Sequence, residues 1–163
     1  AALLNSVGIG LTNVIFTYVG ISLIDKLGRR SLMYIGSIGY IVSLTLISLS
    51  FILEWGGVVL PIFLFLFIAS HAIGQGAIIW VYISEIFPNH IRSYGQSFGI
   101  STHWILAAII PSLIPFLFGS IGPGIVFGFF AFMMVLQLMF THFIMPETKG
   151  VSLEDLSKKL IKN

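Results

Sequence analysis

The chain has 163 residues, of which 57% are hydrophobic and 9% are charged, and its mean hydropathy is +1.05. Soluble domains carry about 25% charged residues, so this composition excludes an ordinary soluble domain and predicts a membrane protein. The absence of cysteine excludes a disulfide framework, a thiolate metal site and a cysteine nucleophile. The first residue is Ala1, and no basic segment with a cleavage site precedes the first apolar run. We therefore expect the chain to be part of a longer protein.

Uncharged apolar stretches divide the chain into five predicted membrane-spanning helices. A hydrocarbon core of about 30 Å needs roughly 20 apolar residues per helix, and each stretch is long enough. Charges bound the first three stretches, whereas the turn-forming sequence at 119–124 separates the last two. The predicted spans are 1–24, 31–53, 58–86, 95–118 and 124–145.

The remaining residues, 147–163, are expected to form a cytoplasmic tail. Ser152 is placed to cap a short amphipathic helix that has Glu154 and Asp155 near its start. Lys158, Lys159 and Lys162 follow near its end, and this order of charges suits the helix dipole.

The positions of the basic residues predict the orientation of the spans. Five crossings place 25–30, 87–94 and the C-terminal tail on one side of the membrane. All eight Lys and Arg residues fall on that side: Lys26, Arg29, Arg30, Arg92, Lys149, Lys158, Lys159 and Lys162. The positive-inside rule makes that side cytoplasmic and places the N-terminus outside.

Polar residues form stripes on three of the predicted helices. The stripes are Ser6, Asn13, Thr17 and Gly20 in the first span, His71, Gln75 and Tyr82 in the third, and Ser97, Ser101 and Trp104 in the fourth. Gly76 and Trp80 lie beside the second stripe, and Gln96 and His103 beside the third. One interpretation is a shared cavity for a polyhydroxylated solute. The other is that these residues only hold membrane helices together, and the pattern leaves both open.

The histidines do not predict a metal site. His71, His90, His103 and His142 have no metal-ligand spacing, and no carboxylate lies near them within a span. His90 and His142 are interpreted as structural, and His71 most simply as a satisfied interior histidine. His71 and His103 could also titrate or form hydrogen bonds in a cavity. No nucleophile–base pair, carboxylate pair or phosphate loop is present, so we predict neither an enzyme nor a cofactor.

Three motifs resemble those of the sugar porters in the major facilitator superfamily. Residues 25–30 read DKLGRR and resemble the D-R-x-G-R-R loop. Residues 84–92 read SEIFPNHIR and resemble the loop after the tenth helix of that family. Residues 146–150 read PETKG, the signature after the twelfth helix. The resemblance covers the chain from the eighth helix to the tail. It implies an all-α membrane protein whose five helices form part of the C-terminal six-helix bundle.

The resemblance also implies roles for individual residues. Asn13, Gly76, Trp80, His103 and Trp104 match positions that contact the sugar in this family. A second set matches the charges that latch one conformational state: Asp25, Arg29, Arg30, Glu85, Arg92 and Glu147. Exposed ion pairs are individually weak, but a network can bias two states that differ by a few kcal/mol.

The chain departs from the family pattern at three positions. Residues 76–80 read GAIIW, without the proline that is usual there, which leaves Gly74 and Gly76 as the flexible points of a stiffer helix. His103 replaces an amide and adds a group that titrates near neutral pH. Ala72 replaces the glutamate of some facilitative glucose carriers, which disfavours that subgroup.

These features predict the C-terminal part of a hexose or pentose transporter that works by alternating access, with protons as the expected coupling ion. Its partners would be the monosaccharide, the lipid bilayer of a plasma or bacterial inner membrane, and the N-terminal half of the same transporter, without nucleic acid. The alternatives are a facilitative uniporter and a sugar sensor that does not transport. The isolated chain is expected to be inactive, because half of a two-bundle transporter has no opposing wall for its cavity.

Overall fold

The computed structural model describes residues 2–152, 154 and 155, and within this part it contains only helices and connecting segments. In chain order the helices are α1 (Ala2–Leu27), α2 (Arg29–Ile52), α3 (Val59–Ile73), α4 (Gln75–Glu85), α5 (Arg92–Ile121) and α6 (Pro123–Phe143). With α3 and α4 taken as one interrupted span, five segments are long and apolar enough to cross a membrane. The protein is therefore an all-α membrane protein, as predicted.

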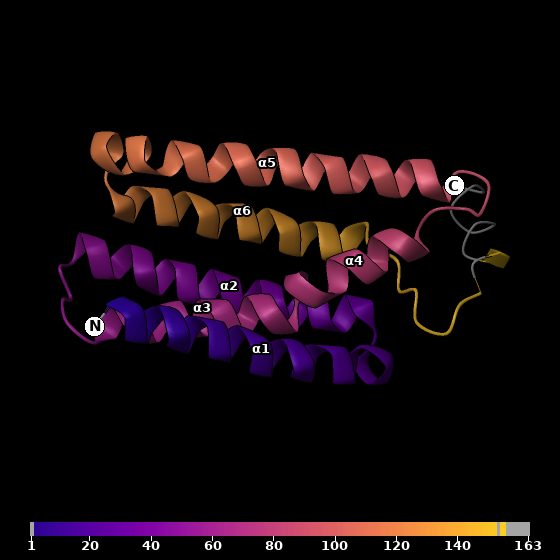
Figure 1. The fold of residues 1–163 in the computed structure, drawn as a ribbon, viewed down its shortest axis with the longest axis horizontal. Helices are drawn as coiled ribbons and strands as arrows, with labels where there is room; N and C mark the ends of the chain where they lie inside the picture. The colour runs from indigo at the N-terminus through magenta and orange to yellow at the C-terminus, as the bar shows by residue number, and fades with distance from the viewer. Residues whose placement is uncertain (1, 153, 156–163) are drawn as a thin grey trace.

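The helices lie roughly side by side in the order α1, α3, α2, α6 and α5 (Figure 1). Helix α2 lies at the centre and packs most extensively against α6 and α3. Helix α5 packs mainly against α6 and α4, and none of its residues is buried. The two edges of the bundle therefore differ, because α5 packs far less extensively against its neighbours than α1 does.

Two single glycines make the tightest connections between helices. Gly28 joins α1 to α2 with φ +89°, and Gly122 joins α5 to α6 with φ +83°. Residues that carry a side chain rarely adopt this left-handed backbone conformation, so both turns strongly favour glycine. Pro123 then begins α6, where its missing N–H costs no helical hydrogen bond.

The third predicted span is two helices rather than one, because the chain is interrupted at Gly74. Gly74 has φ −96° and ψ −105°, which ends α3 and redirects α4. A side chain at Gly74 would lie 2.7 Å from the Cα of Gly36 on α2. The interruption therefore coincides with a close backbone approach that only glycines allow.

The fourth span is also longer than predicted. Helix α5 begins at Arg92 rather than at 95 and ends at Ile121 rather than at 118. It continues through Pro111 and Pro115. The first helix likewise extends beyond the predicted boundary at 24 to Leu27. Charged residues close to the end of a span are thus incorporated into the helices.

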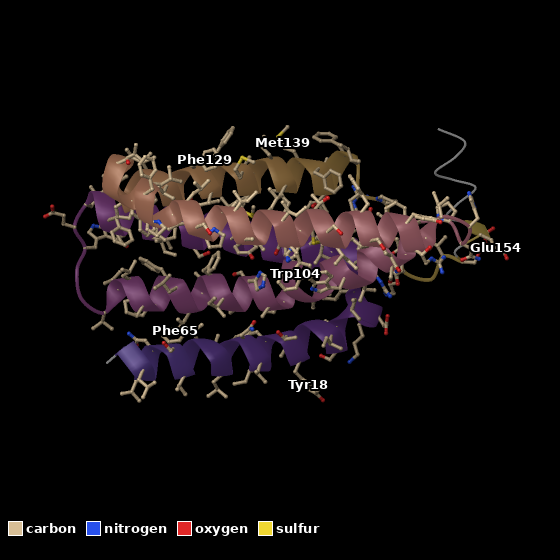
Figure 2. All side chains as sticks on the ribbon, turned by 45° about the horizontal axis from the view of Figure 1, so that its top comes forward. Tyr18, Phe65, Trp104, Phe129, Met139 and Glu154 are labelled. Atoms are coloured by element: carbon tan, nitrogen blue, oxygen red, sulfur yellow. The ribbon has the colours of Figure 1, made fainter. Side chains whose placement is uncertain are left out.

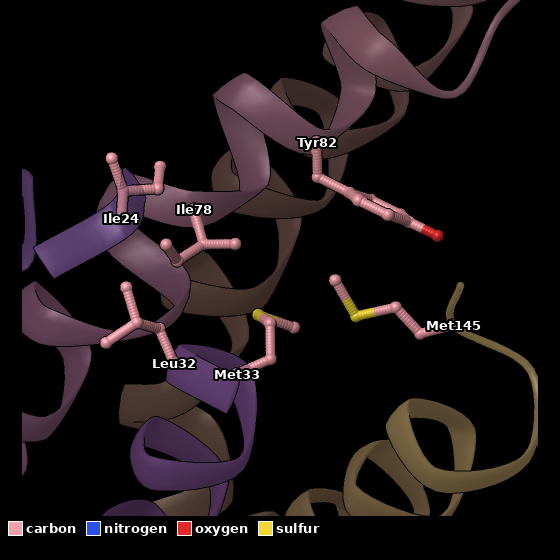
Figure 3. Packing of buried hydrophobic residues seen from close by; sticks show 6 residues of the cluster. All are labelled: Ile24, Leu32, Met33, Ile78, Tyr82 and Met145. Carbon is pink, nitrogen blue, oxygen red and sulfur yellow. The ribbon is translucent and has the colours of Figure 1, made fainter. Parts of the chain in front are cut away.

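Buried side chains concentrate where α1, α2, α4 and the segment after α6 meet. This cluster consists of Ile24, Leu32, Met33, Ile78, Tyr82 and Met145 (Figure 3). A second cluster joins Tyr40 and Leu44 on α2 to Ala131 on α6. Tyr18 on α1, by contrast, points away from the bundle (Figure 2).

Most of the predicted amphipathic tail helix lies outside the described residues. At its start, the Asp155 backbone N–H donates to the Ser152 hydroxyl at 3.2 Å. This is the hydrogen bond that an N-terminal cap makes.

Candidate functional site: an aromatic cavity and a charged cluster

Three of the predicted sugar-contacting residues form an aromatic group between α4 and α5. The Trp80 ring lies 5.0 Å from the His103 ring and 6.5 Å from the Trp104 ring, measured between centroids. His103 and Trp104 are neighbours on α5, with ring centroids 5.5 Å apart. Trp80 is 39% exposed and Trp104 is 62% exposed, so both retain apolar surface that no described residue covers. Such faces suit the apolar side of a sugar ring.

A cavity of about 790 Å³ lies beside this aromatic group, between α2, α3, α4, α5 and α6. Aliphatic and phenyl side chains make up most of its lining. Its polar lining side chains, apart from the indole N–H of Trp80, are those of Tyr40, His71, Gln75, His103 and Gln137. Ligand sites commonly combine an apolar wall with a few polar groups of this kind.

The structure does not bring all five predicted contact residues together. Gly76, Trp80 and His103 line the cavity, and Trp104 reaches it only through its ring neighbours. Asn13 is exposed on α1 and lines neither the cavity nor the aromatic group. Asn13 is therefore separated from the other four predicted contact residues in the described part of the chain.

Gly76 allows His71 to approach the backbone of α4. A Cβ atom at position 76 would lie 2.9 Å from Nε2 of His71 and 3.0 Å from its carbonyl oxygen. Any side chain at this position would therefore displace the imidazole ring. The absence of a side chain at Gly76 thus fixes where His71 lies in the cavity wall.

The polar stripe predicted for the third span divides between two environments. His71 and Gln75 line the cavity, whereas Tyr82 is buried in the hydrophobic cluster of Figure 3. His71 is satisfied on one side, because its Nδ1 forms a hydrogen bond with the Tyr40 hydroxyl. The interpretation of His71 as a hydrogen-bonded interior histidine therefore agrees with this contact.

Sequence reasoning missed two polar residues, Ser37 and Gln137, which form hydrogen bonds behind and at the cavity wall. The Ser37 hydroxyl on α2 accepts a hydrogen bond from the Gln75 amide at 3.1 Å and from the Gln137 amide at 3.4 Å. The Oε1 atom of Gln75 is buried and has no partner within the described part of the chain. Gln137 is the one amide side chain in the predicted span at 124–145, and this isolated position could have marked it as a candidate polar contact.

A second site, which we call the charged cluster, gathers Asp25, Arg29, Glu85 and Glu147 at one end of the helices. Nη2 and Nε of Arg29 donate to the two carboxylate oxygens of Glu85, at 2.8 and 3.1 Å. A fork of this kind is the strongest geometry for a pair of arginine and carboxylate. Nη1 of Arg29 also pairs with Asp25 at 3.0 Å, although the Asp25 side chain is 82% exposed.

Glu147 binds the start of α2 through its backbone. The two carboxylate oxygens of Glu147 accept the N–H groups of Arg29 and Arg30, each at 3.0 Å. These N–H groups begin a helix, where the helix dipole favours a negative charge. A Cβ atom at Gly28 would lie 2.5 Å from Oε2 of Glu147, so the contact requires glycine there.

Further hydrogen bonds attach the segment after α6 to this cluster. The Arg30 side chain donates to the carbonyl oxygens of Thr141 and His142. The Thr148 hydroxyl donates to Glu85, and Nζ of Lys149 donates to the carbonyl of Lys26. The PETKG segment thus connects α2, α4 and the end of α1.

Arg92 does not join the charged cluster, although the resemblance placed it there. Its Nε donates to the Phe87 carbonyl at 3.2 Å, within its own loop. Its Nη2 is buried without a partner, and no described carboxylate forms an ion pair with it. The position of the loop before α5 directs Arg92 toward this backbone rather than toward Glu85.

Comparison with known proteins identifies the family. Residues 1–160 match the family described as "Sugar (and other) transporter". The chain is 38% identical over 157 residues to the arabinose-proton symporter of Bacillus subtilis, covering 94% of this chain and 33% of that protein. It is 37% identical over 158 residues to the D-xylose-proton symporter-like 2 of Arabidopsis thaliana, covering 96% of this chain and 31% of the relative.

The fold agrees with solved structures of the xylose transporter XylE from E. coli. Its inward-open conformation superposes with a TM-score of 0.91 at 29% identity, covering 97% of this chain and 36% of that one. XylE bound to 6-bromo-6-deoxy-D-glucose gives a TM-score of 0.88. The chain spans about a third of the length of the relatives it matches. It belongs to the sugar porter family of the major facilitator superfamily, whose members are transporters and not enzymes.

Proposed function

We propose that this chain is the C-terminal part of a monosaccharide transporter that works by alternating access and is coupled to protons. The observation that carries the proposal is the cavity, in which the exposed rings of Trp80 and His103 lie beside hydrogen-bonding side chains. Sugars present both apolar ring faces and hydroxyl groups, so this combination suits them. The names of the related symporters, for arabinose and xylose, support a monosaccharide substrate and a proton as the coupled ion.

The remainder of the site would come from the N-terminal half of the same transporter. None of the residues of α5 is buried, and Trp104 on this helix is exposed. Asn13 on α1 is exposed as well. These surfaces are the ones that a second bundle is expected to cover. The residues proposed to contact sugar in this half remain Asn13, Gly76, Trp80, His103 and Trp104.

The charged cluster is proposed to stabilise one of the two conformational states. Its hydrogen bonds join helices that would have to separate or rotate at this end during transport. By the positive-inside rule this end, and with it the C-terminus, is proposed to be cytoplasmic. The membrane would be a plasma membrane or a bacterial inner membrane.

Uptake by the full-length protein in proteoliposomes tests the proposed function. Labelled xylose, glucose and galactose are supplied with and without an inward proton gradient. Accumulation above equilibrium that requires the gradient is the expected result. Saturable uptake that only equilibrates would establish a uniporter instead. Binding without uptake would establish a sensor, and no binding of any sugar would reject the substrate class.

A further inference from the structure

His71 and Tyr40 form a polar pair inside the apolar wall of the cavity. Tyr40 is buried on α2, and its ring packs 5.0 Å from that of Phe67. His71 lies in the last turn of α3, and its Nδ1 forms a hydrogen bond with the Tyr40 hydroxyl. The tyrosine ring is thus held by packing, and its hydroxyl points at one imidazole nitrogen.

This hydrogen bond determines the tautomer of His71. The Tyr40 hydroxyl has no other acceptor among the described residues, and a buried hydroxyl without an acceptor is costly. Tyr40 therefore donates, and Nδ1 of His71 accepts. A neutral imidazole carries its proton on the nitrogen that does not accept, so the N–H of His71 is at Nε2.

The Nε2 atom of His71 faces the cavity at Gly76. It lies 2.9 Å from the place that a Cβ atom of residue 76 would occupy, and His71 and Gly76 both line the cavity. No described residue accepts a hydrogen bond from this nitrogen. The pair thus leaves one oriented donor without a partner, on the same cavity wall as Trp80.

We propose that His71 donates a hydrogen bond from Nε2 to a hydroxyl oxygen of the bound sugar, and that Tyr40 is the positioning residue for this donor. The assignment rests on the proposed function and adds one contact residue, His71, and one positioning residue, Tyr40. Tyr40 from α2 and His103 from α5 are the titratable side chains that line the cavity with His71, and its described lining includes no Asp, Glu, Lys or Arg. The proposed donor is therefore the N–H group of a neutral imidazole, and not a member of an ion pair.

Nitrogen NMR of the full-length protein with labelled histidine tests the positioning role. At mildly alkaline pH, His71 is expected to be a single tautomer protonated at Nε2, assigned by the signal lost in His71→Phe. Tyr40→Phe should convert it to a mixture of tautomers. Tyr34→Phe is the matched control, because the Tyr34 hydroxyl contacts Nδ1 of His142 at 2.8 Å, outside the cavity lining. A His71 proton at Nδ1, or a spectrum unchanged by Tyr40→Phe, would overturn the assignment.

Sugar affinity tests the donor role. One neutral hydrogen bond contributes about 0.5–1.5 kcal/mol, so His71→Phe should weaken binding roughly 2- to 10-fold. His71→Gln keeps an N–H donor and should recover part of the loss. Equal affinity of wild type and His71→Phe would reject the donor role while leaving the substrate class intact. Failure of the wild type to bind any sugar would reject both, whereas the NMR result still decides the role of Tyr40.

Discussion

The charged cluster and the cavity satisfy their polar groups in opposite ways. Glu85 and Glu147 each accept three hydrogen bonds from described residues of other segments or of their own loop. In the cavity, Oε1 of Gln75 and Nε2 of His71 have no partner in the described ranges. Buried polar groups normally find partners within the fold. The two carboxylates of the charged cluster therefore find their partners within this chain, whereas two polar atoms of cavity-lining side chains have none among the described residues.

The largest predicted effect breaks the charged cluster at Gly28. Gly28→Ala places a side chain at φ +89° and a methyl group 2.5 Å from Glu147. Backbone strain alone costs about 1–3 kcal/mol, and displacement of Glu147 adds the loss of a helix cap. Thermal unfolding of the full-length protein in detergent should show a clear decrease in midpoint.

Gly122→Ala is the matched control for this variant. Gly122 has nearly the same φ, +83°, but nothing lies within 4 Å of a Cβ atom there. It should therefore show the strain without the collision. Equal destabilisation by the two variants would mean that the contact between Gly28 and Glu147 contributes nothing.

The next prediction compares the loss of stability when each of the two acidic partners of Arg29 is neutralised. Glu85→Gln removes the charge from a forked pair whose Arg29 side chain is only 12% exposed. Hydrogen bonds to charged groups contribute about 1.5–3 kcal/mol, so unfolding should require correspondingly less denaturant. Asp25→Asn removes the exposed partner instead and should cost at most about 1 kcal/mol. The reverse ranking would show that exposure does not decide the strength of these pairs.

A further effect concerns Ser37, which lies behind the cavity-lining amides. Ser37→Ala removes the acceptor shared by Gln75 and Gln137, and the net loss should be about 1 kcal/mol per hydrogen bond. Ser50→Ala is the control, because the Ser50 hydroxyl donates only to the Leu46 carbonyl of its own helix. Unfolding in detergent should distinguish the two serines. If both variants behave alike, the amides on α4 and α6 do not depend on Ser37.

The five apolar helical segments could be predicted from the sequence because the bilayer imposes one strong requirement, a long run without charge. The sequence predicted Gly74 to be a flexible point but did not predict that the helix is interrupted there. The interruption coincides with the close approach of Gly36 from another helix, which the sequence does not show. Trp80, His103 and Trp104 were predicted through the resemblance, and the structure brings their rings together. Whether they contact sugar stays a prediction.

The residues that sequence reasoning missed share one property: their partners lie on other helices. Tyr40 and Ser37 occur in a serine-rich span whose polar residues are typical of ordinary helix packing. Their partners, His71 on α3 and Gln75 on α4, become visible only when these helices are placed against α2. The contact between Arg92 and the Phe87 carbonyl could not be predicted either, because motif position does not specify which acceptor a long side chain reaches.

Sugar binding by two tryptophan variants tests the central claim, that the aromatic cavity is the sugar site. Trp80 and Trp55 are matched in exposure, at 39% and 40%, but Trp55 lies in the connection between α2 and α3, outside the cavity. Calorimetric titration of the full-length protein should show affinity reduced about 2- to 10-fold in Trp80→Ala, since an aromatic contact contributes about 0.5–1.5 kcal/mol beyond burial. Trp55→Ala should bind like the wild type. Unchanged affinity in Trp80→Ala for every sugar that the wild type binds would contradict the account.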